Sequence, residues 1–183
     1  MLQLNFHPFP ELETERLLLR QITTDDAAEI FFLRSDEGVM RYIDRERAQS
    51  IQDAEAFIKK ISADIDSNDS IIWALALKEH PMKLIGTICL WHFQKEHFRA
   101  ETGYVLIPEF WKKGIMKEAL VKALDYGFDT VGLHSIEAHI HPDNAASAAL
   151  LEATGFEREA YYKENFYFRG RFLDTAVYSK LQS

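Results

Sequence analysis

Several common features are scarce or missing in the sequence, and each absence removes a class of protein. Cys89 is the only cysteine, which excludes a disulfide scaffold, and its apolar surroundings favour a buried structural thiol over a nucleophile. No stretch approaches the roughly 20 apolar residues of a membrane span. The first residues also lack the basic, apolar and small-residue order of a signal peptide. We therefore expect a cytoplasmic protein without a membrane partner.

Basic residues are in deficit as well. The 21 lysines and arginines are outnumbered by 29 aspartates and glutamates, which gives a formal net charge of −8. This balance argues against a nucleic-acid partner and favours cationic substrates. The chain has neither a Gly-x-x-x-x-Gly-Lys-Ser/Thr loop nor a Gly-x-Gly-x-x-Gly turn after a strand, so nucleotide hydrolysis is not expected.

The apolar periodicity predicts alternating strands and helices with no linker, and therefore one α/β domain over residues 1–183. Helices are expected to begin near residues 27, 51, 115 and 145, with a mobile connection after the first. The expected strands cover residues 15–20, 71–77, 84–91, 100–107 and 135–141, and a hairpin turning at 168–171 follows. The three central strands are expected to form an antiparallel meander.

A strand that runs through a short loop into a helix start, over residues 101–117, is the most informative stretch. The first turn of a helix carries free N–H groups and partial positive charge, and Gly114 allows a ligand to approach the backbone closely. Lys112, Lys113 and Lys117 add positive charge to an otherwise acidic chain. The stretch thus suits a pyrophosphate, although such lysines can equally form a solvated helix face.

Five segments match the pattern of a known family. They are Thr14–Arg20, Glu101–Tyr104, Trp111–Ala119, Pro142–Ser147 and Gly155–Phe156. Through them the sequence resembles the GNAT acyl-CoA-dependent N-acetyltransferases, specifically the RimJ/RimL-like branch that acetylates ribosomal-protein amino termini. The resemblance covers nearly the whole chain, and it implies a central, mostly antiparallel mixed sheet flanked by helices, with acetyl-CoA as the co-substrate.

The resemblance also implies roles for individual residues. Backbone amides of the loop that starts at Trp111 are expected to hold the pantetheine and pyrophosphate. Glu101 is expected to face the acceptor amine, directly or through water, and Ser147 to protonate the departing thiolate. The expected cofactor-binding residues are Val105, Leu106, Ile107, Trp111, Lys112, Lys113, Gly114, Ile115, Met116, Lys117, Asn144 and Ser147.

Three of these expectations have structural alternatives or departures. Glu101 could be a solvated strand residue, and Asn144 and Ser147 have the spacing of a helix N-cap and the third helical residue. The superfamily pattern begins with Gln or Arg and ends with Gly or Ala, whereas this chain has Trp111 and Met116. We therefore expect the Met116 side chain to pack into the core and to leave only its N–H to the ligand.

The histidines do not define a metal site. His139 and His141 share a strand face, with His134 just upstream, but no third convergent ligand can be established, so no metal is predicted. His92 and His97 flank the expected meander near the proposed site. Either could line a substrate pocket, and the spacing selects neither.

These observations predict direct transfer of an acetyl group from acetyl-CoA to a primary amine, with a protein α-amino group as the first candidate acceptor. The alternatives are a small amine (a polyamine, an aminoglycoside or an amino-acid derivative) and a non-catalytic acyl-CoA-binding sensor. Residues 35–49 are expected to form the rim that selects the acceptor. The sequence does not fix the oligomeric state, and a homo-oligomer is compatible with it.

Overall fold

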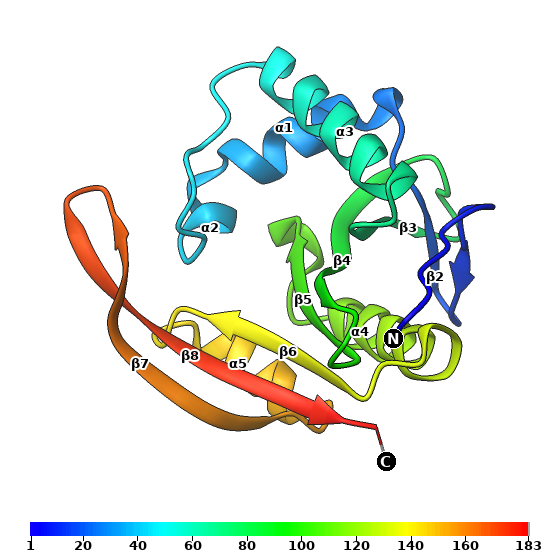
Figure 1. The fold of residues 1–183 in the computed structure, drawn as a ribbon. Helices are drawn as coiled ribbons and strands as arrows, with labels where there is room; N and C mark the ends of the chain where they lie inside the picture. The colour runs from blue at the N-terminus through cyan, green and yellow to red at the C-terminus, as the bar shows by residue number, and fades with distance from the viewer. Residues whose placement is uncertain (183) are drawn as a thin grey trace.

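A computed structural model describes residues 1–182 and centres on one eight-stranded sheet (Figure 1). The strand order is β1-β2-β3-β4-β5-β6-β8-β7, and every neighbouring pair is antiparallel except β5 and β6. The strands are β1 (Leu12–Glu13), β2 (Leu17–Gln21), β3 (Ile71–Leu77), β4 (Leu84–Gln94), β5 (Arg99–Leu106), β6 (Ser135–Ile140), β7 (Glu157–Phe168) and β8 (Arg171–Leu181). This confirms the expected α/β fold with a mostly antiparallel mixed sheet.

The helices connect the strands in the expected order. They are η1 (Thr24–Asp26), α1 (Ala27–Ser35), α2 (Glu37–Met40), α3 (Ile51–Asp66), η2 (Pro108–Phe110), α4 (Ile115–Asp125), the π-type turn η3 (Tyr126–Val131) and α5 (Ala145–Glu152). In Figure 1, α1 and α3 cover one side of the sheet, and α4 and α5 cover the other. Among residues 1–182, no helix combines the length and apolarity needed to cross a lipid bilayer.

Helix α3 shows why the local pattern was informative. Its N-cap, Ser50, accepts a hydrogen bond from the Asp53 N–H at 3.3 Å, and the Asp53 carboxylate accepts one from the Ser50 N–H at 3.0 Å. This reciprocal pair satisfies two donors that have no partner within the helix. One face then buries an apolar stripe, which consists of Ala54, Ile58, Ile61 and Ile65. Capping and burial together define the helix that the sequence predicts.

The connection after α1 differs from expectation. It contains the short helix α2, whose N-cap Asp36 accepts a hydrogen bond from the Val39 N–H at 2.9 Å. The cap supplies the local order that the turn-rich composition did not reveal. Strand β1, which pairs with β2, was also not expected.

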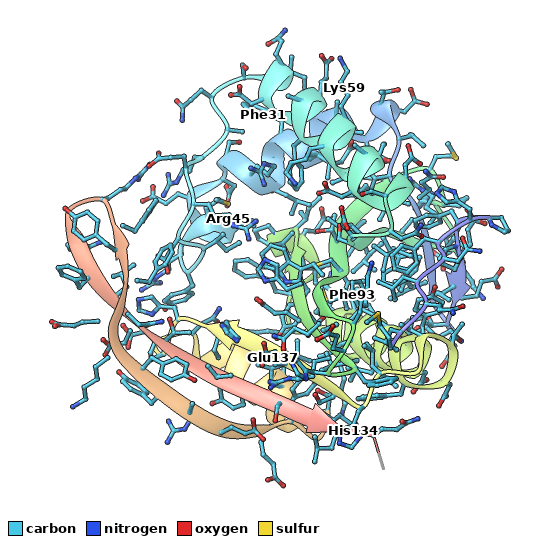
Figure 2. All side chains as sticks on the ribbon, viewed as in Figure 1. Phe31, Arg45, Lys59, Phe93, His134 and Glu137 are labelled. Atoms are coloured by element: carbon cyan, nitrogen blue, oxygen red, sulfur yellow. The ribbon has the colours of Figure 1, made fainter. Side chains whose placement is uncertain are left out.

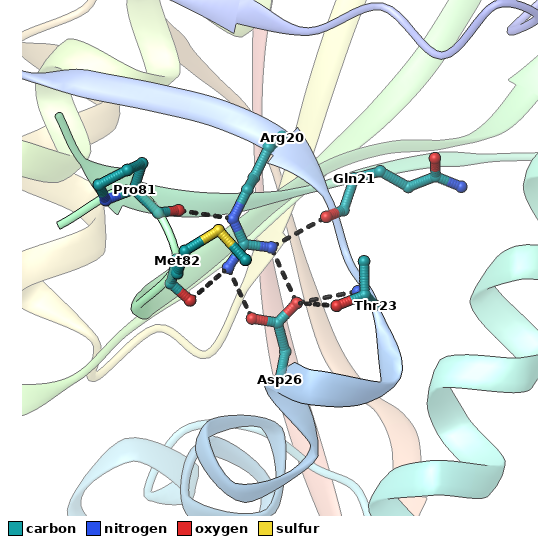
Figure 3. Close-up of polar contacts among 6 residues, drawn as sticks. All are labelled: Arg20, Gln21, Thr23, Asp26, Pro81 and Met82. Carbon is teal, nitrogen blue, oxygen red and sulfur yellow. Dashed lines mark hydrogen bonds and ion pairs between the residues drawn. The ribbon is translucent and has the colours of Figure 1, made fainter.

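The N-terminal half of the sheet is fastened to its helices by a buried ion pair (Figure 3). The Arg20 guanidinium donates to both carboxylate oxygens of Asp26, at 2.9 and 2.6 Å. Its remaining acceptors are the carbonyl oxygens of Gln21, Pro81 and Met82. All five N–H groups therefore have partners, which is the condition under which a buried charge is tolerated. Asp26 also accepts from the Thr23 N–H at 2.8 Å, so the pair holds the start of α1 beside β2.

Candidate active site

The sheet opens where its one parallel pair ends. β5 and β6 are in register only from Arg99/Ser135 to Glu101/Glu137, and beyond these residues the two strands separate (Figure 1). We call this point of separation the fork. On the other edge of β5, the Ile107 N–H donates to the Ile85 carbonyl of the antiparallel partner β4. Backbone groups alternate between the two edges of a strand, so those of Tyr104 and Leu106 point into the fork.

Side chains of β4 and β5 divide into two faces at the fork. Trp91 lies directly across from Glu101, so both project from the same face, which we call the front face. Tyr104 has the opposite parity and projects from the other face, the back face. A ligand that enters the fork therefore has access to groups of both faces.

On the front face, Glu101 holds a histidine. Its Oε2 lies 2.9 Å from Nδ1 of His92. The Glu101 side chain is 12% exposed, whereas that of His92 is 64% exposed. The carboxylate is therefore largely shielded, and the imidazole is the solvent-facing member of the pair. His92, which the sequence could not separate from His97, is thus the histidine at the candidate site.

A second carboxylate stands next to Glu101, because Glu137 is its register partner on β6. Glu137 accepts a hydrogen bond from the Arg99 guanidinium, and its other oxygen lies 3.4 Å from Nε2 of His139. Arg99 compensates the Glu137 charge, while the contact that Glu101 makes is with an imidazole. The front face therefore keeps one carboxylate without a permanent cationic partner.

Cys89 also lies on the front face, opposite Gly103. Its thiol donates to the Gly103 carbonyl oxygen at 3.3 Å, and burial raises the pKa of this thiol to about 12. A thiol with this pKa stays protonated at neutral pH and is a poor nucleophile. Cys89 is partly rather than fully buried, and its raised pKa favours the structural role over a covalent acetyl-cysteine.

Residues 41–48 border the front face. Arg45 (labelled in Figure 2) extends toward β4, where its guanidinium lies 4.8 Å from the centre of the Trp91 ring. Glu46 pairs with Arg169 at 2.7 Å, which links this segment to the turn between β7 and β8. Both partners of that link are exposed, so it is a surface contact rather than a core interaction. Part of the segment 35–49, which is expected to select the acceptor, therefore adjoins the front face.

The back face carries a pair of hydroxyl groups. The Tyr104 and Ser147 oxygens lie 2.8 Å apart, although 43 positions separate these residues in the chain. Ser147 is buried, and burial raises the pKa of Tyr104 to about 12. Asn144 caps α5 by accepting from the Ser147 N–H at 3.1 Å. The capping alternative for Asn144 and Ser147 is therefore real, and it fixes Ser147 beside β5.

The loop after β5 has the backbone shape that an anion site requires. Lys112 and Gly114 both adopt left-handed conformations, with φ of 59° and 74°. In α4, the first internal hydrogen bond runs from the Glu118 N–H to the Gly114 carbonyl. The N–H groups of residues 115–117 precede that bond and have no acceptor within the helix. Such a loop and helix start can surround a phosphate with backbone donors.

Neighbouring side chains brace this loop. Arg16 donates to the Lys113 carbonyl at 3.0 Å and to the Glu118 carboxylate at 2.7 Å. A hollow of about 530 Å³ lies alongside, with Arg16, Gly114 and Lys117 in its lining. Met116 is buried in the core, as expected from its bulk. Three carboxylates and three cations share this lining, so its charge is mixed. The fit to a CoA pyrophosphate rests on the N–H groups of residues 115–117, which have no acceptor within the helix, and on the absence of a side chain at Gly114.

Trp111 closes the strand side of the same loop. Its indole N–H donates to the Leu106 carbonyl at 2.7 Å, which uses one of the backbone groups that point into the fork. The ring itself remains 44% exposed. Trp111 therefore fixes the distance between the end of β5 and the helix start.

The arrangement defines an α/β protein whose forked sheet has a carboxylate–imidazole pair on one face and a pair of hydroxyl groups on the other, beside a helix start suited to a phosphate. The sequence model of a protein family described as "Acetyltransferase (GNAT) domain" matches residues 16–157 of this chain. The chain therefore belongs to the GNAT acetyltransferase family. It is an acetyl-CoA-dependent N-acetyltransferase. The resemblance drawn from the five sequence segments is confirmed.

Relatives and solved structures agree on this class and differ in acceptor. The chain is 40% identical over 171 residues to the uncharacterized N-acetyltransferase YoaA of Bacillus subtilis, covering 93% of this chain and 96% of YoaA. It is 27% identical to a ribosomal-protein-S5-alanine acetyltransferase structure from Vibrio fischeri, with a TM-score of 0.81 and coverage of 94% and 96%. It is 28% identical to spermidine N-acetyltransferase from Vibrio cholerae, solved with CoA and spermine, with a TM-score of 0.81 and coverage of 92% and 97%.

The structure brings together some predicted site residues and separates others. Glu101 and Ser147 lie on opposite faces of β5, both near the fork. His139 contacts Glu137, whereas His141 packs against Tyr42 in a tilted arrangement with ring centres 5.6 Å apart. His92 and Tyr104 are the two neighbours of the predicted residues to which the sequence assigned no role.

Proposed function

We propose that this enzyme acetylates the α-amino group at the amino terminus of a protein, in the cytoplasm. The observation that carries the proposal is the position of Glu101 and Ser147 on the two faces of the fork. An amine that approaches from the front face meets Glu101, and the sulfur of an acetyl-CoA held from the back face meets Ser147. Direct transfer between the two substrates then needs no covalent enzyme intermediate.

In this proposal, each group of the chain has one task. Backbone N–H groups of residues 115–117 bind the pyrophosphate. Within the predicted stretch 105–107, the Leu106 N–H is the backbone donor that faces the fork, and it guides the pantetheine. Asn144 adds a contact with the cofactor. Glu101 assists the loss of a proton from the acceptor amine, and Ser147 supplies a proton to the departing sulfur.

Two observations favour an α-amine over a polyamine. An α-amino group has a pKa near 7.7–8.0 and an alkyl ammonium such as that of lysine near 10.4, so far less deprotonation is needed at neutral pH. In addition, Arg45 lies on the front face and would repel the second and third charges of a polyamine. The spermidine acetyltransferases among the relatives keep a polyamine as the second candidate.

An acceptor panel tests the proposal. The wild-type enzyme is supplied with acetyl-CoA and one of three acceptors: a peptide with a free amino terminus, the same peptide N-blocked but containing lysine, or spermidine. Thiol release measured over time should be fastest with the free amino terminus and near background with the blocked peptide. A higher kcat/KM for spermidine than for the peptide with a free amino terminus would show that the preferred acceptor is a small amine and not a protein. Binding of acetyl-CoA without turnover on any acceptor would favour a sensor.

A further inference from the structure

We propose that His92 is the residue that accepts the proton of the acceptor amine, and that Glu101 is a positioning residue that holds the imidazole. This inference rests on the proposed function and refines the task given there to Glu101. It is drawn from the geometry of the front face, where the exposed ring and the shielded carboxylate form one hydrogen-bonded unit.

The hydrogen bond fixes which ring nitrogen is free. An ionised carboxylate can only accept, so the contact of 2.9 Å between Glu101 Oε2 and His92 Nδ1 places the proton on Nδ1. The lone pair of a neutral ring then lies on Nε2, on the side away from Glu101. With its side chain 12% exposed, Glu101 is far less accessible to an incoming amine than His92 at 64%.

The backbone holds His92 in an unusual position. The register between β4 and β5 shifts between Trp91 and Gln94, and His92 in this bulge has φ of 49°. A bulge redirects a side chain that regular pleating would send to the opposite face. Here the imidazole stacks on its neighbour Trp91, with ring centres 4.0 Å apart and planes inclined by 12°. Strained backbone of this kind is concentrated at functional sites.

The charges around the pair are compatible with this task. Glu101 faces His92 from β5, and Arg45 approaches the same Trp91 ring from the segment after α2. On β6, the Glu137 carboxylate is already held by Arg99. Glu101 is therefore the carboxylate that remains to hold the His92 imidazole through Nδ1. An imidazole also gains and loses protons near neutral pH, unlike an ordinary carboxylate.

The proton balance of the step is simple. The amine nitrogen forms a bond to the thioester carbonyl carbon, and the bond between this carbon and sulfur breaks. The proton lost from nitrogen passes to Nε2 of His92, while the departing sulfur takes one proton from the Ser147 hydroxyl. His92 then releases its proton to solvent, to which the ring is open, and Ser147 recovers a proton from solvent by relay through the Tyr104 hydroxyl at 2.8 Å. No oxidant or further reactant is needed.

Three variants separate proton transfer from a structural role. His92→Asn keeps an N–H donor for Glu101 in a residue that tolerates positive φ, but it cannot carry a proton. His92→Gly suits the same backbone and leaves space for free imidazole. His97→Asn is the matched control, because His97 is exposed and lies three residues after the end of β4. Each variant is assayed with acetyl-CoA and the best wild-type acceptor, and its melting temperature and acetyl-CoA affinity are measured in parallel.

We expect His92→Asn and His92→Gly to lower kcat by about 10² or more, within the usual range of general-base assistance, at unchanged acetyl-CoA affinity. Added imidazole should restore activity to His92→Gly and not to His92→Asn, which a structural role would not produce. His97→Asn should keep wild-type activity. Wild-type-like turnover by His92→Asn would overturn the inference and return the task to Glu101. A wild-type enzyme that acetylates no amine would instead reject the proposed function.

Discussion

Removing one partner of the Arg20–Asp26 pair should cost much of the stability of the fold. The two side chains are only 9% and 3% exposed and meet at 2.6 Å. In Asp26→Ala, the guanidinium keeps its three carbonyl acceptors but loses its counter-charge inside the protein. Breaking a buried pair in this way typically costs about 3–5 kcal/mol. For a chain of this size each kcal/mol lowers Tm by roughly 2–4 °C, so a fall of about 6–20 °C is expected.

The measurement is urea unfolding of Asp26→Ala, followed by circular dichroism at neutral pH. Asp64→Ala is the matched control, because Lys60 and Asp64 also meet at 2.6 Å but are 69% and 32% exposed. An exposed helical pair of this kind contributes only about 0.3–0.5 kcal/mol. The double variant Arg20→Met/Asp26→Leu should recover much of the loss, since it leaves no unpaired charge in the interior.

A loss below about 1 kcal/mol in Asp26→Ala, equal to that of the surface control, would refute the reasoning, since burial would then make no difference. The affinity for acetyl-CoA at a temperature where both proteins are folded should not change, because the pair lies outside the fork. A drop in affinity there would show that the pair shapes the site as well.

Three further predictions concern the site. Gly114→Val should weaken acetyl-CoA binding at least tenfold, because φ of 74° strains a branched residue and its side chain would crowd the phosphates. The affinity is measured by calorimetry, and an unchanged value would show that the phosphates bind at another place. Ser147→Ala should lower kcat by about 10² while acetyl-CoA affinity stays near wild type, and a loss confined to stability would leave Ser147 a capping role only. Partial burial raises the pKa of Glu118, but the hydrogen bonds from Thr14 and Arg16 lower it by more than burial raises it, so the net shift is downward. The Glu118 carboxylate therefore stabilises the fold above roughly pH 4.3, and this stabilisation is lost as the pH falls through the lowered pKa. The difference in unfolding free energy between wild type and Glu118→Gln should shrink over that pH range. A difference that stays constant would contradict a lowered pKa for Glu118.

Elements with strong local signals could be predicted from the sequence. The capping box and apolar stripe of α3 lie within 16 consecutive residues, and the meander strands are apolar runs separated by turns. The helix start after Gly114 is local as well. In each of these cases the determining contacts join residues close in the chain, so the pattern contains them.

The fork and its partners could not be predicted in the same way. Whether β5 and β6 separate after Glu101 depends on packing between distant segments. His92 lies within the one-residue bulge of β4, whereas His97 lies after that strand. The composition around the two histidines does not show where the bulge falls. Tyr104 meets Ser147 only because α5 folds back against β5. The apolar periodicity of a sequence does not specify which distant segments pair with one another.

The alternation of side chains along β5 also limits how this protein can change during evolution. Adding or deleting one residue between Glu101 and Tyr104 would exchange the faces of everything beyond that point, so the carboxylate and the phenol would come to lie on the same side. Loops such as residues 41–48 can lengthen or shorten without that penalty. New acceptors are therefore accessible through insertions at the rim, whereas the stretch of β5 from Glu101 to Tyr104 can vary only by substitution.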